Sequence, residues 1–107
     1  MGKGYAVVAR CWSSGSLPGD LDLVAWQEAV LCFCEVKSRT TRDPNPAEAV
    51  IDLHKRNLLR KLARQYLQQL GLEEPPPTRF DAIAVYMEPG KRPEVEHCEG
   101  AFGWGET

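Results

Sequence analysis

Two carboxylates and a lysine are placed where they could act together. Asp22 lies near the start of a β-forming stretch, and Glu35 and Lys37 end a second such stretch, residues 29–37. On a strand, side chains two residues apart share a face, so Glu35 and Lys37 are expected to project together. If the two stretches pair as a hairpin, Asp22 joins them. Because close carboxylates repel each other unless a cation lies between them, Asp22 and Glu35 are predicted to bind Mg²⁺ or Mn²⁺.

The chemistry predicted for such a site is hydrolysis of a phosphodiester bond. A divalent cation lowers the pKa of a bound water and polarises a phosphoryl oxygen. Lys37 would orient that water or stabilise the negative charge that develops. The same three residues could instead form a partly exposed salt bridge at a sheet edge, and the residues alone leave both interpretations open.

Basic residues gather in the middle of the chain. Residues 37–72 carry eight basic and three acidic side chains, whereas residues 73–107 carry three and eight. Lys55 falls in line with the apolar stripe of a predicted helix, so it should point towards the sheet, where it could contact a phosphate or pair with Glu48. Three arginines repeat every four residues on another face, which is either a solvated surface or a surface for phosphates. The candidate nucleic-acid contacts are Arg39, Lys55, Arg56, Arg60 and Arg64.

The elements that must position these residues form an α/β plan. The expected strands are residues 5–12, 21–26, 30–38, 79–87 and 94–102. A helix over residues 46–70 is predicted from Asn45 as its cap, Pro46 at its first position and Glu48 three residues after the cap, and it should end at Gly71. The order β-β-β-α-β-β predicts a mixed sheet in which the helix crosses between two parallel strands.

Length and composition fit one globular domain over residues 1–107. No apolar stretch approaches the roughly 20 residues that a membrane span needs, and the start shows no signal-peptide pattern, so a cytoplasmic protein without membrane contact is expected. The four cysteines form no CxxC pair and are expected to be reduced, mostly buried thiols; a zinc site built with His97 is the weaker interpretation.

Five short motifs, in this order and spacing, resemble the YraN-like family of bacterial proteins, whose function is poorly defined. They are GDLDLV at 19–24, FCEVKSR at 33–39, PAEAV at 46–50 followed by Lys55, RFD at 79–81 and GAF at 100–102. The resemblance implies a restriction-endonuclease-like fold, beside Holliday-junction resolvases and other PD-(D/E)xK nucleases. It also implies a metal-dependent nuclease site with Asp22, Glu35 and Lys37 as catalytic residues and with Asp22 and Glu35 as the metal ligands.

The chain departs from that family pattern at three places. The N-terminal helix with which family members usually begin is lacking, so one sheet face is expected to be open and a homodimer could cover it. Asp20 stands where the family usually has a glutamate, and Gly100 stands where it usually has an asparagine. The expected function is a metal-dependent endonuclease acting on DNA, with branched or damaged DNA as candidate substrates. The alternative is a non-catalytic nucleic-acid-binding or assembly module on the same fold.

Overall fold

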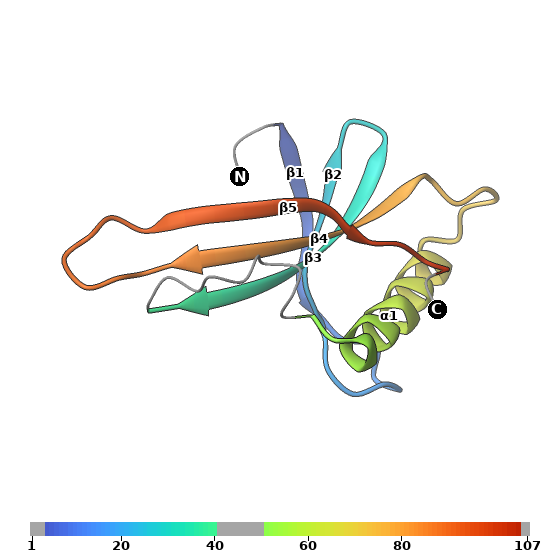
Figure 1. Cartoon of the computed structure of the whole chain (residues 1–107). Helices are drawn as coiled ribbons and strands as arrows, with labels where there is room; N and C mark the ends of the chain where they lie inside the picture. Colours follow the sequence, from blue (N-terminus) through green and yellow to red (C-terminus); the bar gives the residue numbers. More distant parts are fainter. Residues whose placement is uncertain (1–3, 41–50, 106–107) are drawn as a thin grey trace.

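The computed structural model describes residues 4–40 and 51–105, which form five strands and one helix (Figure 1). The elements are β1 (Tyr5–Trp12), β2 (Leu21–Gln27), β3 (Val30–Arg39), α1 (Leu53–Leu70), β4 (Thr78–Tyr86) and β5 (Glu94–Phe102). The predicted bounds of β1 and β5 are confirmed, and those of the other strands differ by one residue at one or both ends. The predicted order of strands and helix is therefore confirmed.

The five strands form one mixed sheet in the order β1-β2-β3-β4-β5. Neighbouring strands are antiparallel except β3 and β4, which are parallel. A two-residue turn, Glu28 and Ala29, joins β2 to β3 and fixes their register. Two parallel strands need a long crossover connection, and α1 lies within it. The α/β mixed sheet with a crossover helix is thus the observed fold.

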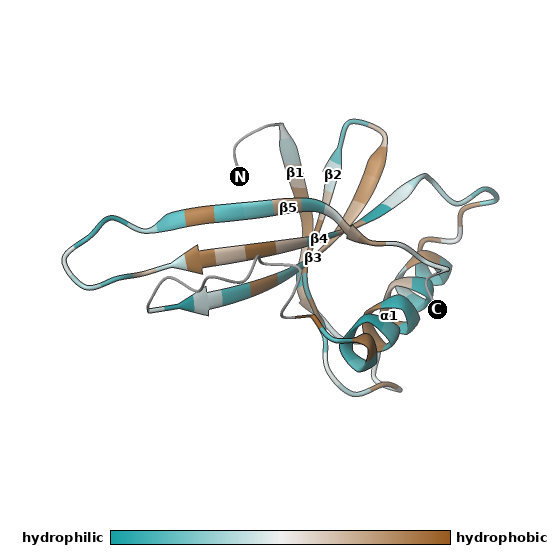
Figure 2. Ribbon diagram, viewed as in Figure 1, coloured by the Kyte–Doolittle hydropathy of each residue, from teal (hydrophilic) through white to brown (hydrophobic). Residues whose placement is uncertain are grey.

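Helix α1 covers one face of the sheet near the end where β1 and β2 lie (Figure 1). Its apolar side packs on buried residues of β2 to β5 and on Trp12 of β1, whose ring lies 5.3 Å from that of Tyr66, to form the main core. Most of the helix surface visible in Figure 2 is hydrophilic. The buried helix side chains of this core are Leu59, Leu62, Ala63 and Tyr66. Their strand partners include Val24, Leu31, Phe33, Phe80 and Phe102. Burying one large apolar side chain contributes roughly 1.5–3 kcal/mol, so this packing holds the helix in place.

The helix begins later than the sequence predicts. Asp52 has an extended backbone, with φ −72° and ψ 172°, and its side chain caps the helix by accepting a hydrogen bond from the Lys55 backbone N–H at 2.8 Å. Ile51 is buried but precedes the helix, so the prediction that the helix includes Ile51 and Asp52 is wrong. The predicted cap residues Asn45, Pro46 and Glu48 lie outside the described residues.

The predicted end of the helix is confirmed. Gly71 has a positive φ of 66°, and its N–H donates to the Gln68 carbonyl oxygen, which closes the last turn. With 18 residues, α1 is about 27 Å long, shorter than the helix that the sequence predicts. Within the described ranges, no helix is long and apolar enough to cross a membrane.

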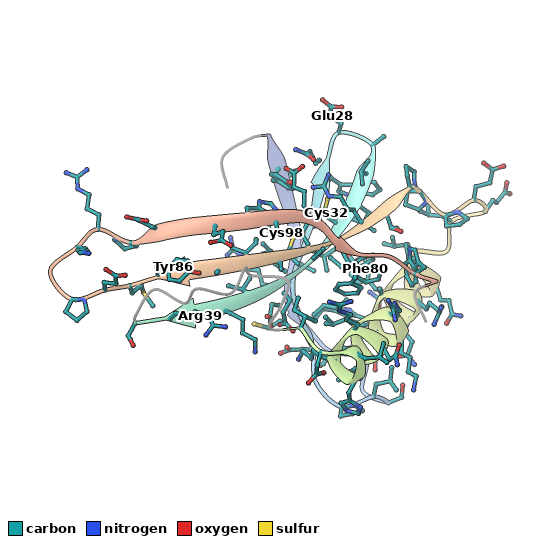
Figure 3. All side chains as sticks on the ribbon, in the orientation of Figure 1. Glu28, Cys32, Arg39, Phe80, Tyr86 and Cys98 are labelled. Atoms are coloured by element: carbon teal, nitrogen blue, oxygen red, sulfur yellow. The ribbon has the colours of Figure 1, made fainter. Side chains whose placement is uncertain are left out.

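The sheet face opposite α1 has a second, smaller core. Tyr5, Ala25, Cys32, Cys34 and Ile83 are all buried there within the single chain. The expectation of an open apolar face is therefore wrong for these residues, and the homodimer inferred from it stays a prediction. Figure 3 labels Cys32 on this sheet.

The thiols follow the expectation in part. Among the four free cysteines, Cys32 and Cys34 are buried, Cys98 is half-buried and Cys11 is exposed. Burial raises the pKa of the Cys34 thiol to about 12, and the nearby Asp81 carboxylate adds to the effect. Cys34 is therefore an inert core residue and not a nucleophile.

Candidate functional site

The turn between β2 and β3 brings Asp22 and Glu35 together, as the hairpin predicts. Leu23 pairs with Cys34 across the two antiparallel strands, so the next residues along, Asp22 and Glu35, also lie opposite each other. The two carboxyl groups share a hydrogen bond, and Asp22 Oδ2 also accepts a hydrogen bond from the Val36 backbone N–H at 2.9 Å. Two acidic groups are thus held side by side on the face that α1 covers.

Lys55, from the first turn of α1, reaches the same place. Its Nζ lies 3.3 Å from Glu35 Oε2, and the side chain of Glu35 is 3% exposed against 36% for that of Lys55. Oε2 is a buried atom, and the ammonium faces it at ion-pair distance as its described partner. The predicted direction of Lys55, towards the sheet, is confirmed, and its described ion-pair partner is Glu35.

The pKa values of Glu35 and Asp22 are shifted in opposite directions. Burial is the main reason that the pKa of Glu35 is raised to about 7, and the neighbouring Asp22 raises it further, against the opposing effect of Lys55. For Asp22, burial also acts to raise the pKa, but hydrogen bonds from Glu35 and from the Val36 N–H outweigh it and leave this pKa below its usual value. One carboxylate therefore stays ionised, and its neighbour holds a proton up to near neutral pH.

These residues fit a hard divalent cation. Mg²⁺ takes oxygen ligands, usually one or two carboxylates, and fills its other positions with water or substrate oxygens. Asp22 and Glu35 offer two carboxylates, and Oε2 of Glu35 is a buried oxygen whose described partner is the ammonium of Lys55. Among the described residues, no three or more histidine, cysteine or acidic side chains lie together as a group that could hold a metal ion.

Two other residues flank the pair. Lys37 lies two residues after Glu35 on β3, and its side chain is exposed. Asp20, where the resemblance leads one to expect a glutamate, lies within hydrogen-bonding reach of Asp22. Gly19 has φ +76°, and a Cβ there would lie 3.3 Å from Leu58 Cδ2. This glycine therefore lets the loop that carries Asp20 pass close to α1.

The helix arginines do not form the solvated row that their spacing suggests. Arg56 and Arg60 lie over the Phe102 ring, at 5.5 and 5.3 Å from its centroid, and Arg64 lies 5.3 Å from that of Trp104. Arg60 is only 4% exposed, and its Nε donates to the Gly103 carbonyl oxygen at 2.8 Å. For Arg60 the prediction of an exposed residue is wrong, because the end of β5 packs against this helix face.

Arg39, the remaining candidate for a phosphate contact, ends β3 and is half-buried. It is in register with Tyr86 on the parallel strand β4, and Figure 3 labels both residues on the part of the sheet that extends away from α1. Strand β3 thus carries both Arg39 and Glu35 of the candidate site.

A second polar cluster, which we call the Asp81 network, lies on the other face of the sheet and was missed by the sequence analysis. Asp81 is 1% exposed and accepts hydrogen bonds from Arg79 Nε and Nη2 at 2.7 and 2.9 Å, and from the Gly100 N–H at 3.0 Å. Its Oδ2 also lies 2.9 Å from His97 Nε2. Arg79 in turn donates to the Tyr5 hydroxyl at 2.6 Å and to Gln27 Oε1 at 2.9 Å.

The Asp81 network differs from the Asp22–Glu35 pair because its central carboxylate is fully satisfied. Burial acts to raise the pKa of Asp81, but the hydrogen bonds from Arg79, Gly100 and His97 more than offset it and lower that pKa. An aspartate inside the apolar run RFDAIAVYM is the signal that could have indicated a buried polar network.

Comparison with known proteins gives one consistent result. The model of the uncharacterised protein family UPF0102 matches residues 1–85. A UPF0102 protein of Koribacter versatilis is 46% identical over 99 residues, which cover 92% of this chain and 67% of the relative. A UPF0102 protein of Symbiobacterium thermophilum is 42% identical over 101 residues, covering 94% and 82%, and one of Solibacter usitatus is 36% identical over 100 residues, covering 94% and 74%.

The matched region contains β1 to β3, α1 and nearly all of β4, and therefore includes Asp22, Glu35 and Lys55. The YraN-like resemblance of the sequence motifs and these matches agree, and this chain belongs to the uncharacterised protein family UPF0102.

Proposed function

We propose that this protein is a metal-dependent endonuclease that hydrolyses phosphodiester bonds in DNA. The observation that carries the proposal is the Asp22–Glu35 pair, in which the half-buried Asp22 lies beside a buried Glu35 whose pKa is raised to about 7. Perturbed pKa values of this kind concentrate at functional sites.

Each side chain has a distinct proposed role. Asp22 and Glu35 would hold Mg²⁺ or Mn²⁺, and the cation, when bound, would supply Lewis acidity towards a phosphoryl oxygen and a water. Lys37, exposed two residues past Glu35, would orient the attacking water by hydrogen bonding and stabilise the negative charge that develops on the phosphate. The Val36 N–H fixes the Asp22 carboxylate, so this ligand is oriented before a substrate arrives.

Contacts to the DNA backbone would come from basic side chains near this pair. Lys55 lies against Glu35 with its side chain 36% exposed, and Arg39 lies four residues beyond Glu35 on β3. Arg64 is exposed farther along α1, whereas the packing of Arg56 and Arg60 on Phe102 gives those two a structural role. Such contacts hold phosphates without reading bases, so we propose recognition of the DNA backbone and its shape, with branched or damaged DNA as candidate substrates.

The direct test is calorimetric titration of Mn²⁺ into the parent chain and into Asp22→Asn and Glu35→Gln. Binding by the parent that either substitution abolishes is the expected result, and Glu74→Gln, an exposed carboxylate in the loop after α1, should bind like the parent. Linear, nicked and branched DNA would then be incubated with Mn²⁺. If the parent binds no metal, alone or with DNA present, the catalytic proposal is wrong.

One observation favours a second candidate function. Lys55 already lies within ion-pair distance of Glu35 and so partly neutralises the site without a cation. A non-catalytic nucleic-acid-binding module on the same fold would use the pair as a structural element. That function predicts DNA binding that weakens with salt, since phosphate contacts release counterions, but that does not change with Mn²⁺ or with Glu35→Gln.

A further inference from the structure

The ammonium of Lys55 and a divalent cation need the same carboxylate oxygen. Nζ lies 3.3 Å from Glu35 Oε2, a buried oxygen atom. We propose that Lys55 is a displaceable internal counter-ion, which neutralises the Asp22–Glu35 pair in the metal-free protein and is released towards a substrate phosphate when a divalent cation binds. This inference rests on the proposed function, because it assumes that the pair takes a metal.

Geometry makes the two cations compete. A magnesium ion binds carboxylate oxygen at about 2.1 Å, so an ammonium at 3.3 Å from the same oxygen would be no more than about 5.4 Å from the metal. Both charges are positive, and the Glu35 side chain is almost completely buried, so water screens their repulsion poorly. The ammonium therefore has to leave or the metal binds weakly.

The surroundings of Lys55 allow its side chain to move while its backbone stays in place. Its backbone N–H donates to Asp52 Oδ1 at 2.8 Å, and the next residue is held by a hydrogen bond from the Arg56 N–H to the Asp52 carbonyl oxygen at 2.9 Å. Its side chain is about one third exposed and has four rotatable bonds. A rotamer change would carry Nζ from the carboxylate to solvent without disturbing the helix.

Release of the ammonium couples two binding events. In the metal-free protein Lys55 is engaged by Glu35 and contributes little to binding of a polyanion. Once a metal replaces it, the same positive charge can contact a phosphate. Because coupling between two ligands is reciprocal, a divalent cation should raise nucleic-acid affinity and nucleic acid should raise metal affinity.

The first experiment measures Mn²⁺ affinity by calorimetry for the parent, Lys55→Met and a matched control, Lys61→Met, an exposed lysine on the same helix. Lys55→Met is expected to bind Mn²⁺ at least about fivefold more tightly, the lower end of typical coupling between sites, and Lys61→Met should match the parent. Lys55→Gln serves as a second variant if thermal melting shows that Lys55→Met does not fold.

The second experiment measures the affinity of labelled double-stranded DNA by fluorescence anisotropy, with chelator or with Ca²⁺, an oxygen-binding cation of the same charge. The parent should bind DNA more tightly with Ca²⁺, whereas Lys55→Met should lose most of this increase and Lys61→Met should keep it.

The outcomes separate the inference from the proposed function. Equal or weaker Mn²⁺ binding by both Lys55 variants overturns the inference and leaves the metal site standing. Mn²⁺ binding by Lys55→Met where the parent shows none, even with DNA present, also overturns the inference, because the lysine is then a fixed counter-ion that a metal does not displace. If neither the parent nor any variant binds Mn²⁺, both the inference and the proposed nuclease are wrong.

Discussion

Glu35→Gln should make the metal-free protein more stable at alkaline pH, although it removes a group from the candidate site. The pKa of Glu35 is raised from 4.5 to about 7 by burial and by Asp22. Between these pH values the native protein binds a proton that the unfolded chain has lost, so the free energy of unfolding falls as pH rises. Glutamine keeps the shape of the protonated carboxyl and cannot ionise, which removes this loss.

The magnitude follows from the size of the shift. One pKa unit corresponds to about 1.4 kcal/mol, so a rise from 4.5 to about 7 costs the metal-free parent at most roughly 3 kcal/mol of stability above pH 7. Glu35 is almost fully buried, so little of this is lost to solvent screening. The stabilisation of Glu35→Gln relative to the parent should be near zero at pH 4 and approach that figure at pH 8.

Urea unfolding in the presence of a chelator, at several pH values from 4 to 8, measures this difference. Glu74→Gln, an exposed carboxylate, should follow the pH dependence of the parent. Adding Mn²⁺ at pH 8 should stabilise the parent, by about 2.7 kcal/mol at a free concentration one hundred times the dissociation constant, and should leave Glu35→Gln unchanged. The reasoning is refuted if Glu35→Gln and the parent keep the same stability difference at pH 4 and pH 8.

Two further predictions concern stability elsewhere in the fold. Asp81→Asn removes the charge that Arg79 and His97 surround in a buried network. It should lower the free energy of unfolding, measured in urea at pH 7, by about 3–5 kcal/mol. Glu99→Gln changes a side chain that is 44% exposed and should lower that free energy by less than about 1 kcal/mol. A loss below 1 kcal/mol for Asp81→Asn would mean that the network adds little stability. Glu28, at the tip of the β2–β3 turn (Figure 3), has φ +53°, a backbone conformation that favours glycine. Glu28→Gly should therefore raise the melting temperature, whereas Ala29→Gly beside it should lower it. A lower melting temperature for Glu28→Gly than for Ala29→Gly would contradict backbone strain at Glu28.

Much of the site could be predicted because it depends on local geometry. A short connection between β2 and β3 leaves few registers, and the alternation of side chains then places Asp22 opposite Glu35. The direction of Lys55 follows in the same way from helical spacing. These features depend on residues that are close in sequence, or on the period of a single element.

The features that could not be predicted depend on residues far apart in sequence. The burial of Arg60 is set by Phe102 and Gly103 in the C-terminal part, more than forty positions away, and helical periodicity cannot show which segment covers a second face. The helix start was predicted at Asn45 because it has a good capping sequence, but Asp52 also caps, and the structure uses it. Local propensity could not decide between two acceptable caps.

The Asp81 network has a consequence for how the protein is made. A ribosome delivers β1, β2 and β3 first, and these can pair through short connections, while Arg79 and Asp81 arrive only after α1. His97 and Gly100, which complete the hydrogen bonds around Asp81, emerge later still, and Tyr5 and Glu99 in the same network lie 94 positions apart. Without β5, Asp81 keeps only its hydrogen bonds from Arg79, so we expect the network and the packing around it to form only after β5 has emerged, as a slow step set by topology.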